Sequence, residues 1–227
     1  MTDDGFTQRV NKVGALADPI RRALYRFVAR QPGAVSRDQA ARGIEVPRHT
    51  AKFHLDKLVD EGLLITEFRR LTGRSGPGAG RPAKLYRRTR KEIAVTLPLR
   101  RYDLASQVLA DAVERALDGT PMAEAVRDAA DHAAAVVLDA WPPEDAEDLS
   151  RVEGVLTRLG YEPRRDGNAL ALGNCPFDRL SADHRELVCG MNHHFVEALD
   201  RRLGCDHLEV DDVEPGPGCC VRITQGL

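Results

Sequence analysis

The sequence predicts an α+β protein with an N-terminal winged helix-turn-helix, central helices and a C-terminal α/β domain. Three observations lead to this fold class. Helical patterns followed by two strand patterns occupy residues 18–89, which is the element order of a winged helix. A helical region covers residues 104–141, and mixed helical and strand patterns follow it. We therefore expect three parts, with bounds at 1–98, 99–143 and 144–227.

Residues 18–30 are expected to form the first helix of the winged domain. Asp18 can cap its amino end, and Pro19 takes the first helical position, where the missing N–H costs nothing. One apolar stripe runs along this helix, made of Ile20, Leu24, Phe27 and Val28. The second helix is expected to follow Ser36, which acts as its N-cap, and to end at Gly43.

The third helix is expected within residues 46–62 because its apolar residues share one face and Gly62 ends the pattern. That face consists of Ala51, Leu55, Leu58 and Val59. Residues 63–71 alternate as a strand does, and residues 83–89 resume the strand pattern after a turn rich in glycine and proline. The two strands and their turn would form the wing.

Two helices are expected after the wing, separated by the turn at residues 118–121. The first apolar stripe is Leu104, Val108, Ala112 and Leu117. The second apolar stripe is Met122, Val126, Ala129, Ala133, Val137 and Trp141. The C-terminal part is expected to contain a helix over 145–159, a hairpin over 164–172, a helix over 181–203, and strands over 207–211 and 219–223.

Charge is divided unevenly along the chain. Residues 1–104 contain 22 Lys and Arg against 11 Asp and Glu, whereas residues 105–227 contain 11 against 24. The near-neutral total therefore conceals a strongly basic half and a strongly acidic half. Such asymmetry indicates that the first half binds a polyanion, and we expect double-stranded DNA as the partner.

The face of the third helix opposite its apolar stripe carries side chains suited to the DNA major groove. Arginine, histidine and lysine can donate to base edges or phosphates, and an aromatic edge can touch a thymine methyl group. The residues expected on this face are Arg48, His49, Lys52, Phe53 and Asp56. The residues expected near backbone phosphates or on the wing are Ser36, Arg37, Thr50, Arg74, Arg81 and Lys84. His54 adjoins the apolar face and is expected to be a half-buried structural residue.

At these residues the chain resembles a known group of proteins. "HTAKFHLDKLVDEGLL" followed by "GRPAKLYR" is similar to the winged-helix domain of ArsR-like bacterial regulators, and most resembles the branch of SufR-type iron–sulfur repressors. "NCPF", "LVCGMN" and "CCVRI" are similar to the C-terminal domain of that branch. The resemblance implies a homodimeric repressor on pseudo-palindromic DNA with a C-terminal sensor domain.

All five cysteines lie in the last quarter of the chain. No stretch approaches the roughly 18 apolar residues of a membrane helix, so we expect a cytoplasmic protein, not a membrane protein, whose thiols stay reduced. Such clusters favour metal or redox chemistry over disulfides, and the absence of a C-x-x-C motif disfavours a zinc ribbon. The resemblance implies an iron–sulfur cluster held by Cys175, Cys189 and one of the neighbours Cys219 and Cys220. The candidates for a fourth ligand are Cys205, His184, His193, His194 and a small molecule.

Three alternatives stay open from the residues alone. The cysteines could bind zinc, or bind nothing and pack in the core. The same kind of regulator could then sense a small organic ligand in a pocket lined by Leu170, Leu172, Phe177, Leu187 and Phe195. A thiol-dependent enzyme pairing Cys189 with His184 or His193 is disfavoured, because no nucleophile elbow or phosphate-binding loop accompanies them. The helices at 104–141 are the expected dimerisation surface.

Overall fold

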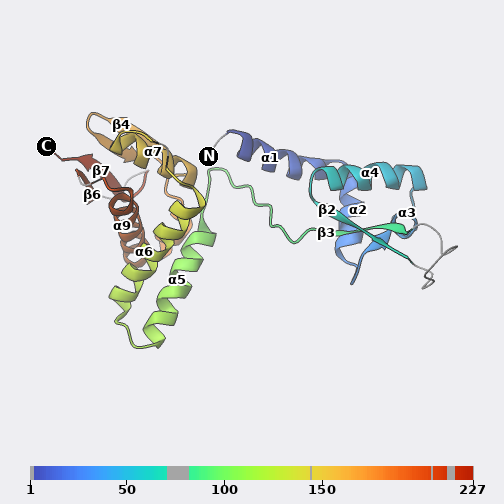
Figure 1. Cartoon of the computed structure of the whole chain (residues 1–227), viewed down its shortest axis with the longest axis horizontal. Helices are drawn as coiled ribbons and strands as arrows, with labels where there is room; N and C mark the ends of the chain where they lie inside the picture. Colours follow the sequence, from blue (N-terminus) through green and yellow to red (C-terminus); the bar gives the residue numbers. More distant parts are fainter. Residues whose placement is uncertain (1–2, 71–81, 144, 206, 214–217, 227) are drawn as a thin grey trace. The chain divides into compact units, whose positions relative to one another are not determined.

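The computed structural model describes residues 3–70, 82–143, 145–205, 207–213 and 218–226. The chain divides into two compact units, Thr2–Val95 and Thr96–Leu227 (Figure 1). The sequence predicts three parts, but the segment 99–143 shares one hydrophobic core with the residues that follow it. The central helices therefore belong to the C-terminal unit.

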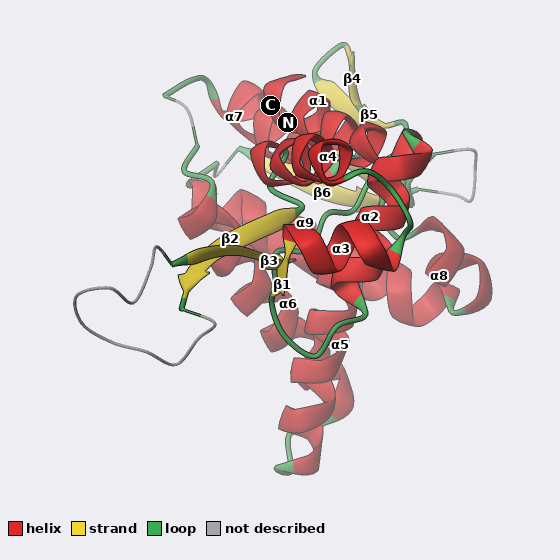
Figure 2. Ribbon diagram, turned by 90° about the vertical axis from the view of Figure 1, so that its right-hand side faces the viewer, coloured by secondary structure: helices red, strands yellow, loops and turns green. Residues whose placement is uncertain are grey.

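The N-terminal unit has the predicted order of helices and wing strands. Strand β3 lies between β1 and β2, and all the pairings are antiparallel (Figure 2). Three elements were not predicted: the first helix, which is polar, and the 3-10 helix η1 and the strand β1, which are too short to show a periodic pattern. The elements are α1 (Asp3–Gly14), a 3-10 helix η1 (Ala15–Ala17), α2 (Pro19–Ala29), β1 (Val35–Ser36), α3 (Arg37–Gly43), α4 (Arg48–Asp60), β2 (Leu64–Arg69) and β3 (Ala83–Arg88).

Local hydrogen bonds fix the helix starts where the sequence predicts them. The Asp18 carboxylate accepts from the Arg21 amide at 2.9 Å, which caps α2. At α3, the Ser36 hydroxyl accepts from the Gln39 amide while the Gln39 side chain accepts from the Ser36 amide, forming a capping box. The buried core between these helices and the sheet includes Leu24, Val28, Ala51, Leu55, Leu58, Leu64 and Tyr86.

The C-terminal unit packs helices against a four-stranded antiparallel sheet of order β4-β5-β7-β6. The expected helix over 181–203 is divided at His184 into a short helix and a long one. The last strand begins at Val221, so Cys219 and Cys220 precede it instead of opening it. The elements are α5 (Tyr102–Leu117), α6 (Met122–Ala140), α7 (Asp148–Leu159), β4 (Pro163–Asp166), β5 (Ala169–Leu172), α8 (Asp178–Asp183), α9 (Arg185–Leu203), β6 (Leu208–Asp212) and β7 (Val221–Gln225).

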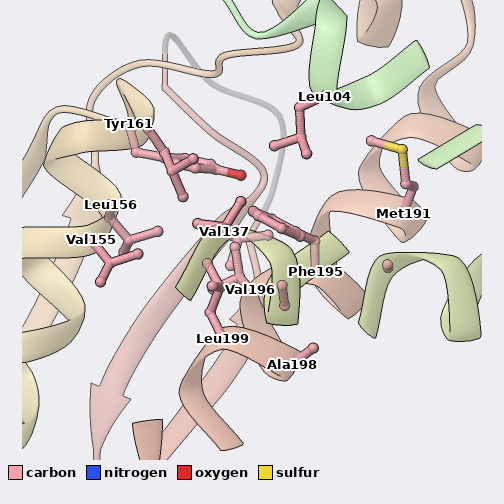
Figure 3. Close-up of a cluster of buried hydrophobic side chains, with 14 of the residues drawn as sticks. Leu104, Val137, Val155, Leu156, Tyr161, Met191, Phe195, Val196, Ala198 and Leu199 are labelled. Carbon is pink, nitrogen blue, oxygen red and sulfur yellow. The ribbon is translucent and has the colours of Figure 1, made fainter. Parts of the chain in front are cut away.

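Helices α5, α6, α7 and α9 and the sheet share one apolar core. Tyr161, Phe195 and Val137 converge in it from three separate segments (Figure 3). Buried alanines on α6 allow close helix packing; they are Ala125, Ala129, Ala130 and Ala134. Arg201 and Arg202 at the end of α9 both donate to the Asp131 carboxylate on α6, which joins these helices at their outer faces. Leu117 and Met122 flank the α5–α6 turn and are exposed, unlike the rest of their predicted stripes.

Gly43 ends α3 against an aromatic ring of α2. A Cβ atom at this position would lie 2.0 Å from the Phe27 ring. The sequence predicts Gly43 as a helix terminator, and the structure adds this packing requirement. The close approach lets α3 and α2 meet without a side chain between them.

We predict that Gly43→Ala lowers the free energy of unfolding by about 1–3 kcal/mol, because the added methyl group overpacks the Phe27 contact. Urea denaturation of the full chain measures the change. Gly33→Ala is the matched control, since a Cβ there has no heavy atom within 4 Å. Equal stability of the two variants would contradict the packing role of Gly43.

Candidate nucleic-acid interface and thiol site

Helix α4 presents a polar face to solvent and an apolar face to the core. Arg48, His49, Lys52 and Phe53 are exposed, and the Phe53 side chain is exposed on 67% of its surface. Thr50 is half-buried. An exposed aromatic ring among cations is costly in water and suits a surface that becomes covered on binding.

An acidic residue of α3 holds the predicted DNA-contacting arginines. The Asp38 carboxylate lies 2.5 Å from Arg48 Nε and 3.6 Å from Arg37 Nε. The side chains of both pairs are partly exposed, so each pair contributes little to stability and mainly restrains the guanidinium groups. Sequence reasoning missed Asp38, although its position in the first turn of α3 is a favourable one for an acidic residue. Ser36 serves α3 as its N-cap, as described above.

A second acidic residue connects α4 to the wing. The Asp56 carboxylate accepts from Lys84 Nζ at 2.6 Å and from the Tyr86 hydroxyl at 2.9 Å. Partial burial opposes ionisation of Asp56, but these hydrogen bonds outweigh it and lower the pKa of the carboxyl group. Burial and the Asp56 hydrogen bond raise the pKa of Tyr86. The network fixes Lys84, a predicted contact residue, relative to α4.

The sequence also makes predictions for Arg74, Arg81 and His54. Arg74 and Arg81 lie outside the described residues. The His54 side chain is 12% exposed, and its Nδ1 atom lies 4.0 Å from the Asp18 carboxylate that caps α2. His54 therefore faces the protein interior, in the position that the sequence predicts for a structural histidine.

A cavity of about 350 Å³ in the C-terminal unit is lined by three thiols from three segments. Cys175 comes from the loop after β5, Cys189 from α9, and Cys220 from the residues before β7. The other lining residues are Asp178, Ser181, Ala182, Arg185 and Gly218. Thiols that are far apart in sequence therefore share one cavity.

Sheet pairing brings two of these segments together. Strands β5 and β7 are neighbours, and the Cys219 amide extends their ladder by donating to the Leu172 carbonyl at 2.9 Å. The chain leaving β5 thus runs beside the chain that enters β7, and Cys175 comes close to the 219–220 pair. Gly218 is needed at this crossing, because a Cβ atom there would lie 2.6 Å from the Leu172 oxygen.

A buried amide joins the thiols to the core. Asn192, which is 1% exposed, donates from Nδ2 to Cys219 Sγ at 3.1 Å and lies 3.8 Å from Cys220 Sγ. Its Oδ1 atom accepts from the Tyr161 hydroxyl at 2.5 Å. Because buried polar groups without partners are costly, this chain satisfies the amide and holds two sulfur atoms in place.

Hydrogen bonds and burial lower the pKa of two of the thiols and raise the pKa of two others. Hydrogen bonding with Cys219 is the main cause that lowers the pKa of Cys175, and a separate interaction with Cys219 is the main cause that lowers the pKa of Cys220 to about 6. Burial raises the pKa of Cys189 to about 12. The interactions with Cys175 and Cys220, together with burial, raise the pKa of Cys219. Cys175 and Cys220 are therefore the thiols most readily converted to thiolates, the form that binds metals.

The terminal pair and Cys205 occupy different environments. Cys220 lines the cavity, whereas Cys219 is buried behind it against Asn192. Cys205 is buried elsewhere, with its sulfur 3.8 Å from the Asp148 carbonyl oxygen. Of the two neighbours that the resemblance leaves open, Cys220 is the one that faces the cavity.

Among the described residues that line this cavity there is no histidine and no Cys205, so none of the predicted fourth-ligand residues is found there. His193 instead pairs with Asp212 at 2.9 Å, and His194 lies 3.7 Å from Glu197. The cavity contains Asp178, Ser181 and Arg185, which sequence reasoning missed because nothing in their local pattern marks them. Within the described residues, no three His, Cys, Asp or Glu side chains are already arranged as a metal site.

The pocket predicted for an organic ligand is filled. Leu170, Leu172, Phe177 and Phe195 are buried in the core, and Leu187 is exposed. A different cavity, of about 380 Å³, lies between α5 and α6 and is lined mainly by apolar side chains. Arg101 and Trp141 form one end of it and make a cation–π contact at 5.5 Å.

Comparison with known proteins identifies the N-terminal region. Residues 16–67 match the family described as a helix-turn-helix domain. The curated proteins include no match to the chain. In the part of the chain that the structure describes, no helix is long and apolar enough to cross a membrane. The helix-turn-helix match indicates a DNA-binding transcriptional regulator and favours this class over an enzyme.

We predict that Arg48→Ala weakens binding to DNA selected by the wild-type protein by about 5-fold or more, because a base contact contributes about 1–3 kcal/mol. Fluorescence anisotropy at fixed salt measures the dissociation constant. Arg127→Ala, an exposed arginine of α6, is the control. Unchanged affinity of the Arg48→Ala protein would show that α4 does not present this residue to DNA.

We also predict that Asn192→Ala lowers the free energy of unfolding by about 1–3 kcal/mol, since Tyr161 and Cys219 lose a buried partner. Urea denaturation under reducing conditions measures the change. Asn168→Ala is the matched control, because its exposed side-chain amide donates to the Gln225 carbonyl. A loss in the control as large as that in Asn192→Ala would contradict this role.

Proposed function

We propose that the protein is a transcriptional repressor that binds double-stranded DNA as a homodimer and is controlled by an iron–sulfur cluster. The cluster would be held by Cys175, Cys189 and Cys220. One observation carries the proposal: three thiols from separate segments line a single cavity in a chain with a helix-turn-helix domain. The resemblance of the cysteine motifs to SufR-type repressors points to the same chemistry.

The donor set suits this group. Thiolates are soft ligands that favour iron–sulfur clusters and zinc, and two of the thiols have lowered pKa values. Arg185 lines the cavity and can offset the negative charge of several thiolates. Asn192 places an N–H donor beside Cys219 and Cys220, and hydrogen bonds to sulfur tune such centres. Zinc at the same residues is the alternative metal.

When bound, the group would supply covalent bonds that join three segments and respond to iron supply and oxidation. The chain itself supplies the points of attachment. Cys175, Cys189 and Cys220 attach the loop after β5, the helix α9 and the start of β7 to one point. Binding of the group would shift a conformational equilibrium of the chain only if the group binds one conformation more tightly than the other.

A dimer fits this control because paired helix-turn-helix domains read half-sites about 34 Å apart. Any change in the spacing of the two recognition helices then alters affinity for DNA. Helices α5 and α6 offer apolar residues that are exposed in the single chain, namely Val113, Leu117, Met122 and Val136. These residues support the helical hairpin as the dimerisation surface.

A second candidate has one observation in its favour. The cavity of about 380 Å³ between α5 and α6 has a mainly apolar lining, with Arg101 at one end and with Gln107, Asp111 and His132 as its other polar residues. Such cavities suit small organic ligands with an apolar body and an anionic group. In that case the same regulator would sense an organic acid, and the cysteines would be structural.

We predict that protein purified without oxygen is brown, absorbs broadly near about 400 nm and contains iron and sulfide. Cys220→Ser should lose most of the iron, because it removes one of three thiols lining the cavity. Cys205→Ser is the matched control, a buried cysteine elsewhere in the unit, and should keep its iron. Zinc in place of iron would identify the alternative metal. Protein with neither metal would rule out this control mechanism and favour the organic ligand.

A further inference from the structure

The segment that leads from the N-terminal unit into α5 is bonded to the loop that carries Cys175. We call residues 96–101 the connecting segment, because the N-terminal unit ends at Val95. We call residues 174–178 the Cys175 loop. Both belong to the C-terminal unit, although more than seventy positions separate them in sequence.

One arginine makes most of this connection. Arg100 Nη1 donates to the Asn174 side-chain oxygen and to the Cys175 carbonyl, each at 2.6 Å. Arg100 Nη2 donates to the Asp178 carboxylate at 3.3 Å. A guanidinium group suits this task because its donors are fixed in a plane, whereas a lysine ammonium is a point charge. The Arg100 side chain is 18% exposed, so water competes only weakly for these bonds.

Main-chain contacts hold the same two segments in register. The Arg101 amide donates to the Pro176 carbonyl at 3.0 Å. The buried Asn174 side chain donates in turn to the Leu99 carbonyl at 3.2 Å and to the Gly160 carbonyl at 2.5 Å. The connecting segment and the Cys175 loop therefore cannot move apart without breaking several hydrogen bonds.

The Cys175 loop is also a wall of the thiol cavity. Cys175 and Asp178 both line it, and both supply acceptors to Arg100. A group that binds the Cys175 sulfur or displaces the Asp178 carboxylate therefore acts on the same loop that supplies acceptors to Arg100. The effect is reciprocal, because a coupling free energy between two sites acts equally in both directions.

We propose that Arg100 is a positioning residue that transmits the state of the thiol cavity to the connecting segment, and so to the attachment of the DNA-binding unit. The choice of an iron–sulfur cluster as the occupant rests on the proposed function. The link between cavity and segment rests only on the contacts of Arg100. Residues 96–101 would be ordered in one state of the cavity and looser in the other.

Hydrogen exchange of the full chain, with and without bound iron, tests this link. In the wild-type protein we expect iron binding to change the exchange rate of residues 96–101 by about 5-fold or more. In Arg100→Gln the iron content should match the wild type while this difference disappears. Arg101→Gln is the matched control, because the Arg101 side chain contacts Asp103 and Trp141 and not the Cys175 loop. It should retain the full difference.

A second variant distinguishes a loss of the Arg100 contacts from a general loss of folding in Arg100→Gln. Asp178→Asn keeps the two contacts of Arg100 with Asn174 and the Cys175 carbonyl, and we expect it to reduce the exchange difference in part. Circular dichroism checks the fold of each variant. The proposal is overturned if Arg100→Gln keeps the wild-type difference, or if iron binds to the wild type without changing exchange in residues 96–101.

The link can be tested even if the proposed function fails. Protein that holds neither iron nor zinc would be alkylated with N-ethylmaleimide, and mass spectrometry would locate the adducts. The reagent can reach the cavity, because Cys189 and Cys220 are only partly buried. An adduct should change exchange in residues 96–101 of the wild type but not of Arg100→Gln. Equal exchange with and without adduct in the wild type would overturn the link.

Discussion

The pairing of β5 with β7 is the constraint on which the thiol site depends. The hydrogen bond from the Cys219 amide to the Leu172 carbonyl continues that pairing past the end of the strand. It fixes Cys175 and Cys220 at one end of the sheet, where α9 adds Cys189. A loop of ordinary flexibility could not hold thiols together at such sequence separation, because closing long loops costs conformational entropy. The paired strands of the sheet already hold these segments close together.

Acidic residues have a different task in each unit. In the basic N-terminal unit, Asp38 and Asp56 each hold cations of the predicted DNA surface in place. In the acidic C-terminal unit, Asp131 and Asp178 join elements that are distant in sequence. Net charge therefore describes the partner that a unit attracts, while individual carboxylates determine how its cations are arranged.

The winged helix could be predicted from sequence because its signals are local. Asp18, Ser36 and Gly62 mark helix ends within a few residues, and apolar periodicity marks the buried faces. The thiol cavity could be anticipated only through a resemblance of cysteine motifs. Its other lining residues, such as Asp178 and Arg185, could not, and neither could the contact of Arg100 with Asp178, because no local pattern encodes them. For the same reason, periodicity could place α5 and α6 but could not show that they share the core of the residues that follow.

Helix α9 joins two regions that have separate properties. Cys189 lies near its beginning, and Arg201 and Arg202 bind Asp131 of α6 near its end. A helix of 19 residues is a stiff rod roughly 28 Å long. Helix α9 therefore runs from a wall of the thiol cavity to the outer face of α6, so a single rigid element belongs to both regions.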